Sequence, residues 1–427
     1  MTALSERRAG GTDVARLRPV RAGVSARAGI WLAALAPIAF LPGLEDRWSW
    51  PKLVLAVAAL LFAVLAPATG RLPRSVLIGG AVVLAVIVLC AALGAAPLEQ
   101  LLGRAPRYAG LVGLLPIAAT VWTGARLLGP RADALAQATY LRACTVAAVA
   151  LAAVAVLETF GARPIASDLD RPGSLAGNAT DQGILGVILL AVTASVLIGS
   201  FRRVGRVSGW AATGAAAGVV AVATSASRAA LLAMAIVLVA LGIRWIAGSR
   251  RRLRDGLIAA LVVLFALAVA FLLPLTRDRV LSATGLAGQT VGDRLQIWAA
   301  AVRVWQRSPW FGVGPGGFMD AVTRDLPAAW YRTTDPSTVL DSTHNLALQV
   351  LVDLGAVGAA VVVAVVVFCS RLAVRGVVAA SGSRRDLLLG GAVAVLAAGV
   401  ALLTTPASPT TLLPLAMLAG ALLAAPA

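Results

Sequence analysis

Charged residues are scarce in this sequence. They make up 13% of the 427 residues, whereas hydrophobic residues make up 59%, and the mean hydropathy is +0.89. Soluble domains contain about 25% charged residues, so a soluble enzyme and a disordered regulator are both excluded. Cysteine is also scarce, and Cys90, Cys144 and Cys369 all lie in apolar runs. That placement excludes a disulfide-stapled secreted module and a thiolate metal cluster.

Apolar runs long enough to cross a bilayer recur along the chain. We therefore predict an all-α fold, a polytopic membrane bundle of about 12 transmembrane helices, since about 17–25 apolar residues cross the hydrocarbon core. We expect an uncleaved first helix, because the Arg-rich segment before it is long for a signal peptide. The expected spans are 29–44, 53–69, 75–95, 109–128, 139–159, 183–200, 208–225, 228–246, 256–275, 344–370, 386–404 and 409–425.

The net charge of +18 gives the expected orientation. When the N-terminus is placed in the cytoplasm, the cytoplasmic loops hold the whole positive excess, as the positive-inside rule requires. The charge then marks contact with anionic lipid headgroups, and no nucleic-acid partner is expected. Both termini are expected in the cytoplasm. The predicted organisation is a cytoplasmic Arg-rich tail at 1–28, transmembrane helices over 29–275, an outer-face loop with short amphipathic helices at 276–343, and transmembrane helices over 344–427.

The expected outer-face loop contains an amphipathic pattern over 292–307. Leu295, Trp298, Val302 and Trp305 recur at helical spacing, which predicts a helix lying along the membrane surface. Asp293 suits the N-terminus of such a helix. An ordinary amphipathic connector would show the same pattern.

Two further features of this loop carry candidate chemistry. Gly314 and Gly316 lie in a Gly- and Pro-rich segment, which can bring backbone close to a ligand or simply make a tight turn. No Lys-Ser/Thr pair follows, so it is not a nucleotide loop. His344, the only histidine, precedes Asn345 at the start of an expected span. It is a candidate general base, with a helix-cap or interface role as the alternative.

Arginines at the expected outer face are the other candidates. Arg228 opens an expected span, where an arginine needs a partner or a cavity unless it reaches the headgroups. Guanidinium groups bind phosphate oxygens bidentately, and Arg104, Arg107 and Asn178 are expected on the same face. No metal-ligand constellation is evident, so the simpler hypothesis is a site with no metal or cofactor in which arginines handle phosphate charge.

An ordered set of motifs resembles the O-antigen ligase and polymerase family of bacterial inner-membrane proteins, from about residue 30 to about residue 370. The set comprises residues 46–52 with Trp50-Pro-Lys, residues 103–110, Gly177-Asn178, Ser227-Arg228, Arg294 with Trp298, residues 308–318, and His344-Asn345 before a span containing Gly355. Each motif is weak alone, but their order along the chain is fairly specific.

The resemblance implies a metal-independent, inverting glycosyltransferase of the GT-C type. Its donor would be a glycan on undecaprenyl pyrophosphate, and its acceptor a hydroxyl of a glycan, lipid or protein at the outer face of the inner membrane. Arg228 and Arg294 would bind the pyrophosphate, and His344 would orient or deprotonate the acceptor. The expected substrate-binding residues are Arg104, Arg107, Asn178, Asp293, Trp298, Gly314, Gly316 and Asn345.

Several functions remain compatible with the sequence. Ligation and polymerisation of glycans both fit the resemblance. A transporter of similar size would place polar groups near the bilayer midplane, where this sequence has almost no charge. A non-catalytic export scaffold would tolerate replacement of His344.

Overall fold

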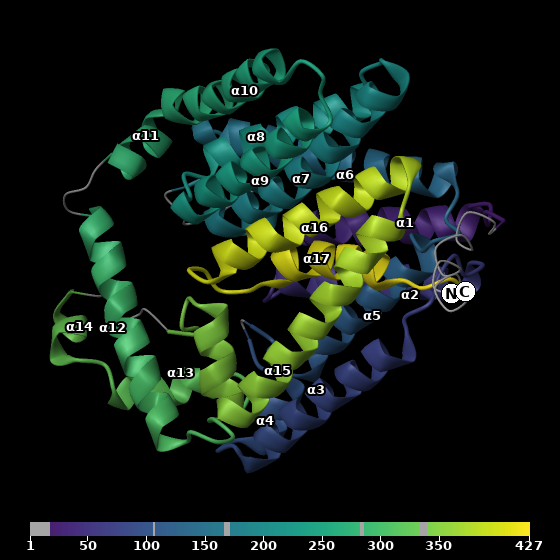
Figure 1. Cartoon of the computed structure of the whole chain (residues 1–427). Coiled ribbons are helices and arrows are strands. Elements are labelled where there is room, and N and C mark those ends of the chain that lie inside the picture. Colours follow the sequence, from purple (N-terminus) through teal and green to yellow (C-terminus); the bar gives the residue numbers. More distant parts are fainter. Residues whose placement is uncertain (1–17, 106, 166–170, 282–285, 334–339) are drawn as a thin grey trace, which may run out of the picture.

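The computed structural model describes residues 18–105, 107–165, 171–281, 286–333 and 340–427 (Figure 1). These residues are mostly helical, and the extended pairing among them is limited to isolated bridges. The all-α class is therefore confirmed for the described residues. Of the expected Arg-rich tail, residues 1–17 lie outside the described residues, as do 282–285 and 334–339 of the expected loop.

Apolar helices lie at the expected windows, and most ends are shifted by a few residues, but α15 ends at Ala379 where the expected span ended at 370. Seven are long and apolar enough to cross a membrane: α3 (Arg74–Leu93), α6 (Ala134–Thr159), α7 (Ala179–Val204), α9 (Arg228–Ala247), α10 (Arg252–Leu272), α15 (Leu346–Ala379) and α16 (Gly382–Leu402). Shorter apolar helices are α1 (Val24–Leu35) with η3 (Ala36–Ile38), α2 (Ser49–Leu65), α5 (Leu111–Leu127), α8 (Gly209–Thr224) and α17 (Pro409–Leu423). An integral membrane protein is supported, while a total of about 12 spans stays a prediction.

Short helices connect the apolar ones. They are α4 (Pro97–Leu102), η4 (Ser174–Ala176), α11 (Pro274–Leu281), α12 (Leu286–Arg307), α13 (Phe318–Ala321), η5 (Val322–Arg324) and α14 (Ala328–Thr333). The helices α12, α13 and α14 form a separate group at the left of Figure 1. The expectation of helices within 276–343 is thus correct.

The helix expected over 292–307 differs from the prediction in two ways. It begins at Leu286, so Asp293 lies inside the helix and not at its N-terminus. A helix can continue through Gly292, because an interior glycine costs only about 1 kcal/mol. The packed face is also rotated: Ala300, Ala301 and Val304 are buried, whereas Leu295 and Val302 are exposed. Small alanines permit close packing, which a pattern of large apolar residues does not predict.

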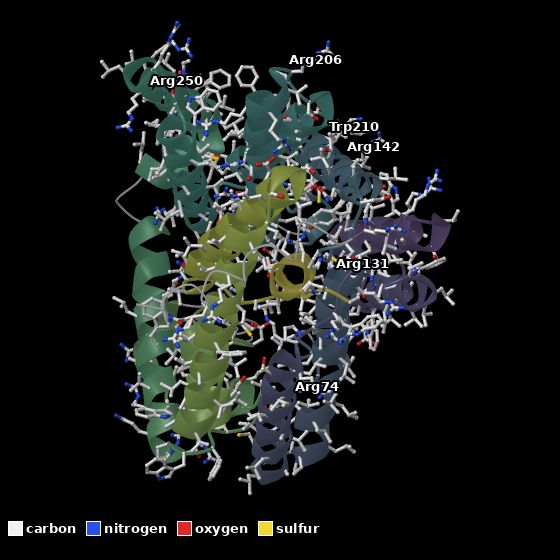
Figure 2. All side chains as sticks on the ribbon, turned by 45° about the vertical axis from the view of Figure 1, so that its right-hand side comes forward. Arg74, Arg131, Arg142, Arg206, Trp210 and Arg250 are labelled. Atoms are coloured by element: carbon white, nitrogen blue, oxygen red, sulfur yellow. The ribbon has the colours of Figure 1, made fainter. Side chains whose placement is uncertain are left out.

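One end of the bundle, which we call the basic face, carries many arginines. Arg74, Arg131, Arg142, Arg206 and Arg250 lie at or near the starts of α3, α6, α8 and α10 (Figure 2). Contacts between distant segments hold this end together. They include hydrogen bonds from the Val20 amide to the Arg131 carbonyl (2.8 Å), from the Arg71 amide to the Ala425 carbonyl (2.9 Å) and from Ser383 Oγ to Gln137 Oε1 (2.6 Å).

The other helix ends form the opposite side of the bundle, which we call the site face. Here the Lys52 ammonium donates to the Leu175 carbonyl at 3.3 Å, Thr410 donates to the Ala176 carbonyl at 3.2 Å, and Thr276 donates to the Ala223 carbonyl at 2.6 Å. Along the chain, successive connections between helices therefore lie alternately at the basic face and at the site face. This is the arrangement of a bundle whose helices run up and down.

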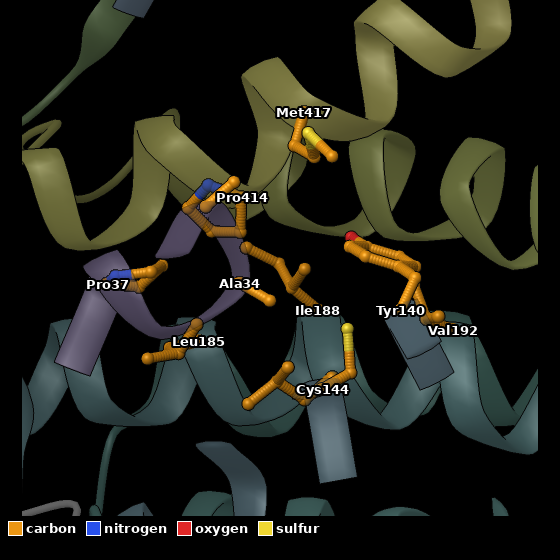
Figure 3. Close-up of a pocket in the computed structure, with 11 residues that line it drawn as sticks. Ala34, Pro37, Tyr140, Cys144, Leu185, Ile188, Val192, Pro414 and Met417 are labelled. Atoms are coloured by element: carbon orange, nitrogen blue, oxygen red, sulfur yellow. The ribbon is translucent and has the colours of Figure 1, made fainter. Parts of the chain in front are cut away.

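The core of the bundle is packed around α7. Residues 181–193 of this helix are buried throughout. Where α1, α6, α7 and α17 meet, Tyr140, Cys144, Ile188 and Met417 surround a void of about 10 Å³ (Figure 3). That is about the space of one water molecule and the lining is almost entirely apolar, so this void belongs to the packed core and is not a substrate site.

Candidate functional site

Arg228 is the first residue of α9 and points its guanidinium across the site face. The hydroxyl of Ser227 caps the helix by accepting from the Ala230 amide. The Arg228 side chain is exposed, and its Nε donates to the backbone carbonyl of Arg279 at 3.1 Å. Among the described residues, no carboxylate forms an ion pair with Arg228. Its charge is therefore positioned by backbone and not neutralised.

Arg294 lies on α12 and interacts electrostatically with Arg228. Burial lowers the pKa of the Arg294 guanidinium, and the nearby positive charge of Arg228 lowers it further. No carboxylate of the described chain forms an ion pair with Arg294 either. Two guanidinium groups without an acid between them create a strongly positive patch, which favours an anion with several oxygens.

His344 lies in a turn directly before α15. Its φ of +54° is uncommon for a residue with a side chain, although histidine tolerates it better than most residues. Two hydrogen bonds hold the turn: the His344 amide donates to Ser342 Oγ at 3.1 Å, and Trp298 Nε1 donates to the Thr343 carbonyl at 3.0 Å. Trp298 lies four residues after Arg294, on the same side of α12. The same helix therefore positions Arg294 and braces the histidine turn.

The surroundings of His344 keep its imidazole neutral. Burial lowers its pKa below the ordinary value of 6.5, and the charges of Arg107 and Arg294 lower it further, while Asp341 raises it. A neutral imidazole at pH 7 has a free nitrogen lone pair and can accept a proton. Direct contacts support grouping His344 with both arginines in one cluster, because Arg107 lies 2.9 Å from Asp341, and Trp298 of α12 donates to the Thr343 carbonyl at 3.0 Å.

Arg107 is held by a carboxylate, unlike the other two arginines of this cluster. Its Nε lies 2.9 Å from Asp341 Oδ2, and its Nη2 donates to Asp341 Oδ1 at 3.0 Å. This two-point contact fixes the segment before His344 against residues 103–110. Arg104, in contrast, pairs with Asp320 at 2.7 Å and with Glu99 at 3.6 Å. The structure gives Arg104 no contact with His344.

Asn178 and Asn345 act as helix caps. The Asn178 side chain accepts from the Asp181 amide at 2.8 Å at the start of α7, and the Asn345 side chain accepts from the Leu348 amide at 3.1 Å at the start of α15. Asn178 therefore lies beside Asp181, which interacts electrostatically with Arg107 and with Lys52. A role for either asparagine in substrate binding stays a proposal.

Lys52 and Asp181 are buried charged residues to which the residue patterns assigned no role, although Lys52 lies in the Trp50-Pro-Lys motif. Lys52 is 1% exposed and its ammonium donates to the carbonyls of Ala39 (2.8 Å) and Leu175 (3.3 Å). It is the only lysine in the chain. A single lysine among many arginines was the feature of the sequence that could have drawn attention to this position.

The Gly-rich segment packs into a break in α15. Gly355 has φ +65°, which interrupts the helix, and a side chain there would collide with the backbone of Trp310. The interrupted helix is completed by the segment: the Val313 amide donates to the Val352 carbonyl at 3.0 Å, and the Ala356 amide donates to the Pro309 carbonyl at 2.8 Å. The backbone groups that the break frees are thus satisfied by protein.

Gly314 and Gly316 lie in this same packing arrangement. The Gly314 amide donates to the Asp353 carbonyl at 3.0 Å, and a side chain at 314 would collide with Gln100. The Gly316 amide donates to the Asp353 carboxylate at 3.3 Å. These contacts explain both glycines as structural, and a direct contact of either with substrate stays a proposal.

A cavity of about 220 Å³ lies next to the histidine turn, between α5, α15 and the start of α17. Its polar lining includes Arg107, Asp341, Gln349, Asp353 and Ser408, and its apolar lining comes largely from α5 and α15. It can accept a small polar group beside the Arg107–Asp341 pair. Among the described residues, no cluster of three or more His, Cys, Asp or Glu side chains could hold a metal ion.

One comparison with protein families found a match to part of the chain. Residues 213–363 match the family described as O-antigen ligase. The matched region holds Arg228, Arg294, His344 and the Gly-rich segment, so the resemblance seen in the sequence is confirmed there. The matched region does not include Arg107, which reaches it through the contact with Asp341. The comparison with curated proteins gave no match.

Proposed function

We propose that this protein is a membrane glycosyltransferase that moves a glycan from undecaprenyl pyrophosphate to an acceptor hydroxyl. The O-antigen ligase match supports a glycosyltransferase of this family. The observation that carries the finer proposal is the convergence of Arg228 and Arg294, without a carboxylate partner in the described chain, beside a neutral His344.

The two arginines would bind the pyrophosphate of the donor. As the bond between the anomeric carbon and the pyrophosphate oxygen breaks, negative charge develops on the leaving group. Positioned cations stabilise such charge most effectively where water is partly excluded. The Arg279 carbonyl holds the Arg228 guanidinium in place, and the partial burial of Arg294 shields its charge from water.

His344 would accept the proton of the acceptor hydroxyl. The acceptor oxygen attacks the anomeric carbon, the new glycosidic bond forms, and the proton passes to the imidazole. Attack from the side opposite the leaving group inverts the anomeric carbon. The lipid pyrophosphate leaves with the electron pair of the broken bond, and the transfer requires no resident metal ion or cofactor.

The orientation follows from the charge of the two faces. The basic face would lie in the cytoplasm of a bacterial cell, with both termini, and the site face would lie at the outer side of the inner membrane. Activity that persists in a chelator would support a transfer without metal. Activity that a chelator abolishes and a divalent ion restores would contradict it.

Complementation with a His344→Ala variant tests the proposal. In a host that lacks its own enzyme, we expect loss of the transferred glycan on a gel, accumulation of lipid-linked precursor, and a normal level of membrane protein. Arg277→Ala is the control for an alanine substitution near the site face that should leave transfer unchanged. Arg277 is exposed, and its ion pair is with the neighbouring Asp278 at 3.2 Å. Unchanged glycan in the His344→Ala host would contradict a catalytic histidine.

The same experiment separates ligation from polymerisation. Loss of attachment with long chains still made would indicate a ligase, and loss of long chains would indicate a polymerase. A transporter would instead leave precursor on the cytoplasmic side, and a non-catalytic scaffold would be indifferent to the substitution.

A further inference from the structure

A second, larger cavity lies far from His344, between α7, α8, α9 and α10. Its volume is about 840 Å³, and its walls are apolar along their length. This is within the range of about 300–1,000 Å³ that is typical of ligand sites. Arg254 and Trp245 line the end of the cavity nearest the basic face, and Leu190 and Val269 line the end nearest the bundle centre.

The helix α10 stands apart from the rest of the bundle on this side. It runs along the upper edge of Figure 1, beside α8 and α9. Ile258, Val262 and Phe265 line the cavity and remain exposed. Large apolar side chains that face an open cavity inside a membrane protein need an apolar occupant, because protein interiors are otherwise close-packed.

The mouth of this cavity is positively charged. Arg254 lines it, and the guanidinium of Arg202 lies 5.3 Å from the centre of the Trp245 ring beside it. The acid at this mouth, Asp255, already accepts from Arg254 Nε at 3.0 Å and interacts with Arg202. Arg206 and Arg250 lie in the adjoining loops, and neither has an ion-pair partner among the described residues.

Trp245 provides an independent indication of a polar ligand atom near this mouth. Its ring lines the cavity, and its buried indole N–H has no hydrogen-bond acceptor within the described chain. Buried tryptophan N–H groups usually find a partner.

We propose that this cavity binds an anionic phospholipid from the leaflet at the basic face. Its acyl chains fill the apolar length of the cavity, and its phosphate lies between Arg202 and Arg254. Apolar walls with a positively charged mouth match the acyl chains and the phosphate of such a lipid. The bound lipid also fixes α10, which leads through α11 to the Arg279 carbonyl that holds Arg228.

Lipid titration by native mass spectrometry of the full-length protein tests this site. The probes are dioleoyl phosphatidylglycerol, which is anionic, and dioleoyl phosphatidylcholine, which is zwitterionic. We expect the anionic lipid to bind more tightly, and Arg254→Gln to weaken it by roughly five-fold while leaving the zwitterionic lipid unchanged. Arg252→Gln is the matched control, because Arg252 is an exposed arginine on the same helix that does not line the cavity.

A second pair of variants tests whether the chains enter the cavity. Ala216→Trp places a large side chain in the cavity and should abolish tight binding of the anionic lipid. Ala260→Trp is the control and should leave binding unchanged, because Ala260 is exposed on a side of α10 that does not line the cavity. Gel filtration confirms folding of each variant. Equal affinity of the protein for both lipids would overturn the proposal. So would an affinity for the anionic lipid that is unchanged in both Arg254→Gln and Ala216→Trp. Because the readout is lipid mass, it does not depend on glycan transfer.

Discussion

Two pairs of arginines, one on each face of the bundle, differ in their partners. On the basic face, Asp386 forms ion pairs with both Arg203 and Arg244, and Ser195 Oγ accepts from Arg244 at 2.6 Å. On the site face, Arg228 and Arg294 interact electrostatically, and no carboxylate of the described chain forms an ion pair with either. A buried arginine that an acid satisfies stabilises the fold. One that no acid satisfies is available to an anionic ligand.

Arg107 lies between these two cases. It belongs to the site cluster, yet Asp341 holds it through two oxygens. It therefore contributes charge to His344 without being free to bind a second carboxylate or phosphate bidentately. Substitutions on the two faces should separate loss of function from loss of stability.

The largest effect is expected for Arg294→Ala. Removing one preorganised cation from developing charge should lower the transfer rate by roughly 10²–10³-fold. Folding should be retained, because no carboxylate loses a partner and the repulsion with Arg228 is relieved. Transfer in proteoliposomes containing a lipid-linked donor measures the rate. Arg294→Lys should restore only part of it, since lysine lacks the planar fork, and full activity in both variants would remove the phosphate-clamp argument.

The second effect concerns the basic face and is a loss of stability. Asp386→Leu leaves Arg203 and Arg244 without their acid, and we expect a cost of about 3 kcal/mol, at the low end for a broken buried pair because Arg203 is partly exposed. Thermal unfolding in detergent should shift downward while transfer per folded molecule stays normal. Adding Arg244→Leu should recover part of the stability. A catalytic defect at unchanged stability would contradict the assigned difference between the faces.

The third effect concerns the break in α15. Gly355→Ala forces a side chain into φ +65° and against the Trp310 backbone, at a cost of roughly 1–3 kcal/mol. Protease cleavage within 308–316 should increase as this segment detaches. Gly399→Ala in α16 is the control, because open space surrounds Gly399 and alanine favours a regular helix. Equal behaviour of the two variants would show that the break carries no strain.

The smallest effect is a shift in pH dependence. Since the pKa of His344 lies below 6.5, the acidic limb of the pH–rate profile should also lie below 6.5. Arg107→Gln removes a positive charge that lowers this pKa, so the limb should move to higher pH. Asp341→Asn removes the charge that raises it, so the limb should move to lower pH. Shifts in the same direction in both variants would disprove electrostatic control of His344.

The membrane class of the fold could be predicted from the sequence because hydropathy is a local property. Runs of uncharged apolar residues fix where helices lie, and most helix ends differ from the expected ones by a few residues. The exception was α12. Its packed face contains Ala300 and Ala301, because small residues allow α12 to pack closely against α15. A pattern of large apolar residues does not identify such a face.

The residue types of the site were also evident in the sequence, but their partnerships were not. A single histidine, arginines at expected helix ends and an ordered set of motifs identify the candidate chemistry. Nothing in the sequence shows that Asp341 pairs with Arg107, that Arg228 donates to the Arg279 carbonyl, or that Lys52 donates to the Leu175 carbonyl. Those contacts join segments far apart along the chain. The sequence alone thus determined a helical membrane bundle with a positive side, whereas tertiary packing decided which buried charges are neutralised and which remain open to a ligand.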